Sequence, residues 1–198
     1  TEVDMTDIVN YVNQNETSFL DKESFKLTYT PFIVNAVVKA IIQFPLMNSS
    51  LEGNDIIHKK NINIGIAVSL DDGLMVPVIE KCEEVNFLGL CRRVNDLTIR
   101  ARSKNLRPDE LQGSTFSISN FGVFNVTMGT PIINQPNVGI LGVGAIKKQP
   151  VVIESDLGDT IGIRSRMILS LGFDHRLIDG AGGSQFIEKI RLEIENMD

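Results

Sequence analysis

The sequence has few of the residue types that bind metals, and it has no long apolar run. Among 198 residues there are two cysteines, two histidines and no tryptophan, and aromatic residues make up only 6%. Two cysteines and two histidines scattered in this way argue against a zinc site, so we expect no metal. The low cysteine content indicates a reducing, intracellular compartment. No apolar run reaches the roughly 18 residues that a membrane-spanning helix needs, so we expect no membrane partner.

Positive charge is also scarce. The chain carries 19 lysines and arginines against 25 aspartates and glutamates, a net charge of -6, with a pI near 5.0. An acidic balance argues against nucleic acid or an anionic membrane as a partner. An anionic substrate would therefore need a local cluster of basic groups or backbone donors.

Aliphatic residues are abundant, and they predict a globular protein with a substantial core. Apolar residues make up 42% of the chain, which is long enough for one domain. No internal repeat or linker-like tract divides it, so residues 1–198 are interpreted as a single domain. The chain starts at Thr1 without a methionine and already resembles a strand there, so we expect a fragment of a longer polypeptide.

The most apolar helix is predicted at residues 30–44. Thr30 as N-cap and Pro31 at the first helical position mark its start, and Pro45 stops it. A thin polar stripe on an apolar cylinder indicates a helix buried against a sheet or a partner. Because this helix is too apolar for the surface of one small domain, it also favours an oligomer.

The other elements follow from hydrophobic periodicity and turn residues. A hairpin is predicted from residues 61–69 and 74–79 around Asp71-Asp72-Gly73. Helical periodicity predicts helices at 86–104 and 184–196, and short strands are expected at 114–119, 138–146, 151–154 and 161–173. This mixture predicts an α+β fold with a mixed, largely antiparallel sheet flanked by helices.

Two features of these elements allow a structural or a functional interpretation. Gly139, Gly142 and Gly144 remove side chains from one predicted strand, which suggests that another backbone or a ligand comes close. In the helix at 86–104, Cys91 lies on the apolar face, which favours a core role. The basic residues of that helix lie mostly on the other face. They form either a solvated surface or a phosphate site.

The sequence DHRLIDG at residues 174–180 is the strongest functional signal. It places His175 four residues before Asp179, directly after a strand and before a helix. A histidine on a tight turn between buried elements can act as a general base, because the scaffold fixes its direction. A capped turn with a solvated histidine explains the spacing equally well.

Four segments, in order along the chain, resemble the catalytic domain of dihydrolipoyl acyltransferases, the core components of 2-oxo acid dehydrogenase complexes. They are NIGIAV and GLMVPV at 63–68 and 73–78, STFSISN at 114–120 followed by Gly122, TPIIN at 130–134 leading to ILGV at 140–143, and DHRLIDG at 174–180. The resemblance covers essentially the whole chain. It implies a two-layer fold like that of chloramphenicol acetyltransferase.

The resemblance also implies an activity and partners. Trimers, or multiples of three, with active sites between subunits transfer an acyl group from dihydrolipoyl-lysine to the thiol of coenzyme A. The lipoyl group is carried on a separate lipoyl domain, and the decarboxylase and dihydrolipoyl dehydrogenase components are further partners. The implied location is the cytoplasm, or the mitochondrial matrix in a eukaryote.

Roles for individual residues come from the same resemblance. His175 is the implied base on the thiol of coenzyme A, and Ser119 is the implied hydroxyl donor to the oxyanion and lines the coenzyme A site. Asp179 is expected to hold the histidine turn through a basic partner, which is either Arg176 or a residue of a preceding segment. Asn120 and Gly144 match further positions that line the coenzyme A site. From the residues alone, a strand hydroxyl that bonds to the backbone is the favoured interpretation of Ser119.

One position departs from part of the family, and the acyl group stays open. Position 69 is often aspartate in branched-chain members but is Ser69 here, which puts that local coenzyme A contact in doubt. Segments 122–124 and 128–131 resemble succinyltransferases, whereas residues 43–46 resemble branched-chain members. A catalytically silent scaffold and a free-standing acyltransferase acting on a small alcohol are the alternative functions.

Overall fold

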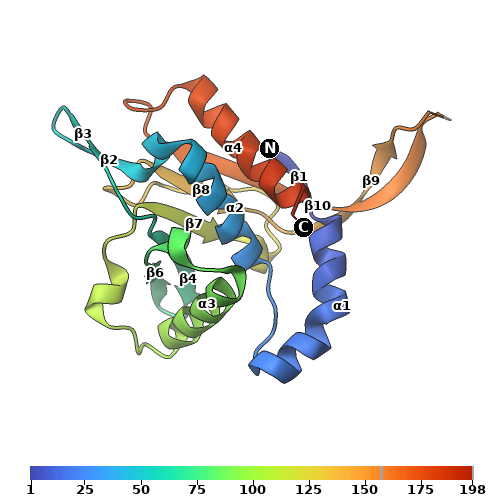
Figure 1. Ribbon diagram of the computed structural model, residues 1–198, viewed down its shortest axis with the longest axis horizontal. Helices are drawn as coiled ribbons and strands as arrows, with labels where there is room; N and C mark the ends of the chain where they lie inside the picture. The colour runs from blue at the N-terminus through green and yellow to red at the C-terminus, as the bar shows by residue number, and fades with distance from the viewer. Residues whose placement is uncertain (157, 198) are drawn as a thin grey trace.

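The computed structural model describes residues 1–156 and 158–197, which form four α-helices and ten β-strands (Figure 1). The helices are α1 (Thr6–Glu23), α2 (Thr30–Gln43), α3 (Phe87–Arg102) and α4 (Gly180–Glu195). The strands are β1 (Glu2–Asp4), β2 (Ser49–Glu52), β3 (Asp55–His58), β4 (Ile64–Leu70), β5 (Gly73–Met75), β6 (Val78–Ile79), β7 (Phe116–Asn120), β8 (Gly139–Val143), β9 (Lys147–Ile153) and β10 (Thr160–Phe173).

The main sheet is mixed, and most of its strand pairs are antiparallel. Its order is β1-β10-β8-β7-β4-β5, with β6 also paired to β4 and β9 also paired to β10. Only the β4–β7 and β7–β8 pairs of this sheet, as described, are parallel. The predicted α+β fold with a largely antiparallel sheet is therefore confirmed.

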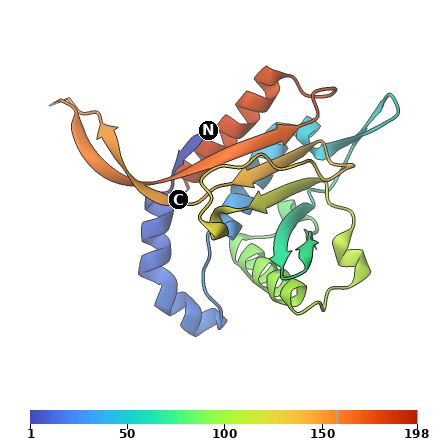
Figure 2. The ribbon, with the colours of Figure 1, turned by 180° about the vertical axis from the view of Figure 1, so that it is seen from behind.

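The molecule has two layers, because helices cover one face of the sheet. In Figures 1 and 2, α2 and α4 run side by side over β7 and β8. Phe116 of β7 packs edge-on against Phe186 of α4, with ring centroids 5.6 Å apart, and both are fully buried. This apolar layer between helices and sheet is the core.

The helix predicted at residues 30–44 is present as α2, but its apolar surface is covered within the chain. Nine of its residues are buried, between Pro31 and Ile41, where the helix packs against α3 and α4. The burial of this helix within one chain means that the expected oligomer must rest on other observations. Tyr29 rather than Thr30 is the N-cap residue.

The protein's own atoms fill the space that the glycines of the β8 region leave free. A side chain at Gly139 would meet the ring of Phe116, and one at Gly144 would lie 2.0 Å from the carbonyl oxygen of Thr127. Gly142 is similarly crowded by the Ser170 hydroxyl. The close approach that the sequence indicated is an internal one.

Several elements differ from the predictions. The hairpin predicted at 61–79 is present, but its second arm is divided into β5 and β6 around Pro77, which cannot donate a ladder hydrogen bond. Helix α4 begins at Gly180, four residues earlier than predicted, because Asp179 caps it. Helix α1 and the β2–β3 hairpin were not predicted.

Two hairpins project from the body in opposite directions. The β9–β10 arm leaves the sheet on one side, and the β2–β3 hairpin leaves on the other, as both views show (Figures 1 and 2). The turn between β10 and α4 lies on the side of the β2–β3 hairpin.

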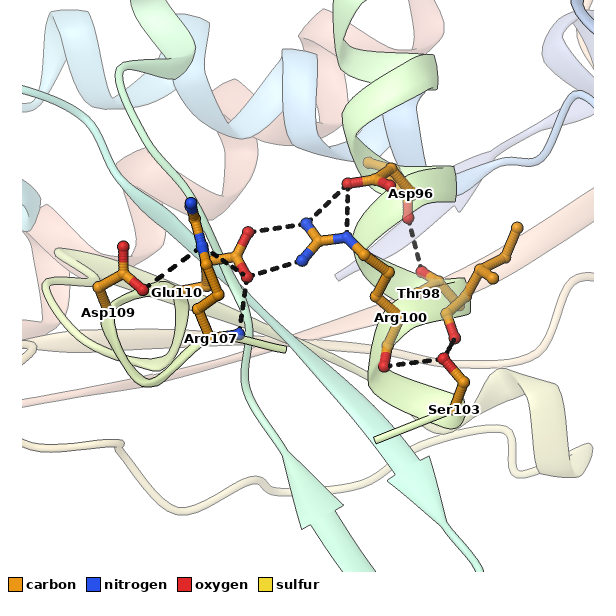
Figure 3. A network of polar contacts seen from close by, with 9 residues as sticks. Asp96, Thr98, Arg100, Ser103, Arg107, Asp109 and Glu110 are labelled. Carbon is orange, nitrogen blue, oxygen red and sulfur yellow. Dashed lines mark hydrogen bonds and ion pairs between the residues drawn. The ribbon is translucent and has the colours of Figure 1, made fainter. Parts of the chain in front are cut away.

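An ion-pair network fixes the segment that leads into β7. Arg100 of α3 donates to Glu110 at 2.6 and 2.7 Å and to Asp96 of its own helix at 2.7 and 3.0 Å (Figure 3). The backbone N–H of Arg107 also donates to Glu110. These donors lower the pKa of Glu110 to about 2. At least one basic residue of α3, Arg100, therefore forms structural ion pairs.

Candidate active site between β7, β8 and the turn after β10

The turn that carries His175 is held by strand pairing and by an ion pair. The backbone N–H of Asp174 donates to the carbonyl of Val138 at 2.8 Å, which extends the β10–β8 ladder one step. The Asp174 carboxylate accepts from the Arg176 backbone N–H at 3.0 Å and from its guanidinium at 2.6 Å. These hydrogen bonds from Arg176 lower the pKa of Asp174. Arg176 is engaged with Asp174, so the alternative in which it partners Asp179 is not supported within this chain.

Asp179 anchors the other end of the same turn. Its Oδ1 accepts from the backbone N–H of Gly182 at 2.7 Å, which makes it the N-cap of α4. Among the described residues, the structure pairs no basic side chain with Asp179. His175 itself is exposed, and its ring centroid lies 5.6 Å from that of Phe173. The turn is thus fixed at both ends while its imidazole faces outward.

Ser119 lies in the middle of the sheet with a free hydroxyl. It pairs with Ala67 of β4 on one side and Gly142 of β8 on the other. Two residues earlier, the Ser117 hydroxyl accepts from the side chain of Asn137 at 2.9 Å. Within the described part of the chain, the Ser119 hydroxyl has no such partner, so the interpretation as a backbone-bonded strand hydroxyl is not supported.

His175 and Ser119 of one chain lie far apart. Ser119 is in the row of Gly142, whereas Phe173 pairs with Gly139. Ser119 and Phe173 are offset by three residues at about 3.3 Å along the strands and by two strand spacings of about 4.8 Å, which places them roughly 14 Å apart. His175 follows two residues after Phe173. A general base must lie about 2.6–3.2 Å from the group whose proton it takes, so the two residues of one chain cannot act together.

Asn120 and Gly144 do lie together. Both line a cavity of about 310 Å³ between the end of β7 and α2, with Tyr29, Ile33 and Met167 among the other walls. The Asn120 side-chain oxygen accepts from the backbone N–H of Gly122 at 3.0 Å, which shapes the turn after β7. A cavity with apolar walls and a polar rim suits a ligand that has both apolar and polar groups. Ser69 lies at another place on this edge of the sheet, paired with Leu74 of β5.

The remaining candidate groups take no part in this arrangement. Cys91 is buried, as predicted, and so is Cys82; burial raises the pKa of the Cys91 thiol to about 11 and that of Cys82 to about 12. In the described chain no group of three or more histidine, cysteine, aspartate or glutamate side chains could hold a metal. None of the helices described is long and apolar enough to cross a membrane.

Two residues near Ser119 were missed by sequence reasoning. Ser170 of β10 lies in the row of Gly142 and donates its hydroxyl to the carbonyl of Gly129. Phe121 follows β7 and packs its ring against both glycines. A serine within the apolar run 167–173 was the only signal for Ser170, and nothing in the local pattern singled out Phe121.

The sequence and fold of this chain match a known family. The whole chain, residues 1–198, matches the family of 2-oxoacid dehydrogenases acyltransferase (catalytic domain). The protein belongs to this family. A likeness to chloramphenicol acetyltransferase, with a TM-score of 0.65 and 13% identity over 98% of this chain and 86% of that one, confirms the predicted fold.

Relatives of this chain are named as components of three different dehydrogenase complexes. The chain is 38% identical to the acetyltransferase component of the Corynebacterium glutamicum pyruvate dehydrogenase complex, over 100% of this chain and 30% of that protein. It is 37% identical to the succinyltransferase component of the Bacillus subtilis 2-oxoglutarate dehydrogenase complex (98% and 46%) and 39% identical to the Bacillus subtilis branched-chain lipoamide acyltransferase component (100% and 46%). The chain thus spans less than half the length of these relatives.

Solved structures agree closely with this fold. A probable dihydrolipoamide acetyltransferase from Listeria monocytogenes superposes with a TM-score of 0.95 at 36% identity, covering 100% of this chain and 83% of that one. The dihydrolipoamide acetyltransferase of Azotobacter vinelandii gives 0.92 at 34% identity, covering 100% and 80%. The Azotobacter work investigates one serine, one histidine and one asparagine in the catalytic mechanism.

Proposed function

We propose that this chain transfers an acyl group between dihydrolipoyl-lysine and coenzyme A, at a site formed by His175 of one copy and Ser119 of another. The separation of these two residues within one chain carries the proposal, since neither has the other within reach. The catalytic histidine and asparagine studied in the Azotobacter enzyme are four positions apart, as are His175 and Asp179.

In this mechanism His175 takes the proton from the thiol of coenzyme A. A thiol with a pKa of about 8.5 is mostly protonated at neutral pH, and the thiolate is the nucleophile. The new carbon–sulfur bond turns the acyl carbonyl into an oxyanion, which accepts a hydrogen bond from the Ser119 hydroxyl. Collapse of the oxyanion breaks the bond to the dihydrolipoyl sulfur, which receives the proton back from His175. Asp179 and Asp174 hold the turn and touch no reacting atom.

Coenzyme A is proposed to reach Ser119 from the edge of the sheet where Asn120 and Gly144 line their cavity. Asn120 offers a side-chain amide at its rim, and Gly144 contributes backbone without a side chain. The lipoyl arm is proposed to enter from the side of the copy that contributes His175.

The assembly is proposed to be a homotrimer or a multiple of three. The β9–β10 arm supports this, because one of its faces is apolar and uncovered. Ile161 pairs with Val152 and Ile163 with Pro150, and these side chains share a face on which Ile161 is 83% exposed and Ile163 69% exposed. An isolated two-stranded hairpin is marginally stable at best, so a second copy is the proposed cover.

The wider partners follow from the family. The proposed donor is a lipoyl domain of the same parent polypeptide, for which residues 1–198 are the single catalytic domain. The decarboxylase and dihydrolipoyl dehydrogenase components are the proposed neighbours in the complex. The proposed location is the cytoplasm, as for enzymes of bacterial metabolism, or the mitochondrial matrix in a eukaryote. The intact set of His175, Ser119 and Asp179 argues against a silent scaffold.

Co-expression of two inactive variants tests the shared site. His175→Ala and Ser119→Ala should each be inactive alone with acetyl-CoA and dihydrolipoamide. Mixed trimers should regain activity, because an interface can combine the intact serine of the first variant with the intact histidine of the second. If the two variants mix randomly and in equal amounts in a symmetric ring, about a quarter of the interfaces contain both an intact histidine and an intact serine. Mixed assemblies no more active than their parents would overturn the shared site, and a wild type without thioester transfer would overturn the activity.

A further inference from the structure

The side chain of Phe121 lies on the same face of the sheet as the Ser119 hydroxyl. Side chains alternate along a strand, so Ser117, Ser119 and Phe121 share the face opposite the helices. The backbone N–H of Phe121 donates to the carbonyl of Val143 at 3.1 Å, so the ladder with β8 still holds this residue. Phe121 is thus a fixed neighbour of the catalytic hydroxyl.

The Phe121 ring leans back toward the row of Ser119. A side-chain carbon placed on Gly142 would lie 3.0 Å from the tip of this ring, and one on Gly129 would lie 2.9 Å from it. The ring therefore occupies the space between two glycines, one of which pairs directly with Ser119. Adjacent strands are about 4.8 Å apart, so the ring borders the position where Ser119 meets an oxyanion.

The coil that covers the ring is itself tied to the sheet. The Ser170 hydroxyl donates to the carbonyl of Gly129, and the Ala145 backbone N–H donates to the carbonyl of Val126 at 2.8 Å. The side chain of Lys147 donates to the Thr127 hydroxyl at 2.7 Å. These contacts leave the ring little room to move when a substrate arrives.

We infer that Phe121 limits the size of the acyl group that the enzyme transfers, by forming a rigid wall beside the Ser119 hydroxyl. This inference rests on the proposed function. A short acyl chain ends before the ring, whereas a longer or branched one must displace it from between Gly129 and Gly142. Since each extra methylene changes discrimination by about 10- to 200-fold in a fitted pocket, one aromatic side chain suffices to separate acetyl from larger substrates.

The test compares acetyl-CoA, isobutyryl-CoA and isovaleryl-CoA as donors to dihydrolipoamide. Wild type should favour acetyl-CoA, and Phe121→Ala should raise the ratio of kcat/KM for isovaleryl-CoA to that for acetyl-CoA by about 10-fold or more. Phe121→Leu, which keeps the core filled, should raise it by a smaller factor. Phe124→Ala is the matched control, because Phe124 lies three residues beyond Phe121 but is 63% exposed, and its ratio should equal that of wild type.

The outcomes separate this inference from the proposed function. An active wild type that prefers isovaleryl-CoA would show that Phe121 does not limit the acyl group. Phe121 variants of native mass and melting temperature with an unchanged ratio would show the same. Either result would leave the proposed function intact. If Phe121→Ala fails to fold, the ratio of Phe121→Leu decides in the same way. A wild type inactive toward all three thioesters would overturn the proposed function and this inference with it.

Discussion

Ser119 and His175 lie toward opposite ends of the central strands of the same chain. Ser119 is level with Gly142 of β8, and the strand that leads to His175 is level with Gly139 at the other end of β8. The antiparallel β10 runs against β7 and β8, so it delivers its C-terminal turn to the edge where those two strands begin. The proposed site therefore needs two copies, and the β9–β10 arm offers an apolar surface for joining them.

Replacing His175 with alanine should lower turnover by about 10²- to 10⁴-fold, because the base acts in the transition state. The Kd for coenzyme A should stay within a few-fold of wild type, since the proposed coenzyme site is lined by other residues. Steady-state kinetics and equilibrium binding check the two parts. Retention of more than a tenth of the activity would remove His175 as the base.

Ser119→Ala should reduce the rate constant by roughly 10²- to 10³-fold through the loss of one oxyanion donor. Stability should change little, because the hydroxyl has no partner within the described chain. A melting curve measured beside the kinetics checks this. If only the Michaelis constants rose, Ser119 would be a binding residue, and an unchanged rate would exclude it from the mechanism.

Asp179→Ala should act through the geometry of the turn. It removes the N-cap of α4 that Asp179 makes with Gly182, which costs about 0.5–2 kcal/mol, and it frees the turn that aims His175. Asp179→Asn keeps a cap of equal quality and should retain most of the activity and melting temperature. Asn and Ala variants that are equally inactive with unchanged melting would show that the charge acts directly on the reaction.

Ile161→Asp should weaken the assembly, because it places a charge on the apolar face of the β9–β10 arm. Light scattering should show a shift from a trimer or larger species toward the 21.9 kDa chain, with a parallel loss of activity. Glu154→Gln, an exposed change on the same arm, is the control. A wild type that is an active monomer would contradict the proposed assembly.

Glu110→Gln should lower the melting temperature at neutral pH and lose its effect in acid. The hydrogen bonds from Arg100 lower the pKa of Glu110 from 4.5 to about 2 in the folded chain. The carboxylate therefore stabilises the fold fully above about pH 4.5, and this contribution disappears as the pH falls toward 2. Asp109→Asn, which removes a carboxyl that is 71% exposed and 3.5 Å from Arg107, should show little difference at any pH. A Glu110→Gln difference that persisted at pH 2 would have another origin.

Much of the fold was predictable because its signals are local. The apolar period of α3 and the Asp71-Asp72-Gly73 turn each act within a few residues, and both were predicted. Helix α1 escaped because only Ile8 and Val12 of its residues are buried, and residues 13–18 contain no apolar side chain that would continue the stripe. The β2–β3 hairpin escaped for a similar reason, since β3 is exposed throughout.

The sequence by itself determined the family and the fold class, because DHRLIDG and STFSISN are contiguous and their order along the chain is enough to recognise them. Only the tertiary structure decided which of those residues can meet. In the structure Asn120 and Gly144 line the same cavity, and Arg176 pairs with Asp174. His175 lies too far from Ser119 of the same chain to act with it. The reason is that strand order and direction set distances between residues far apart in sequence, and no local pattern encodes either.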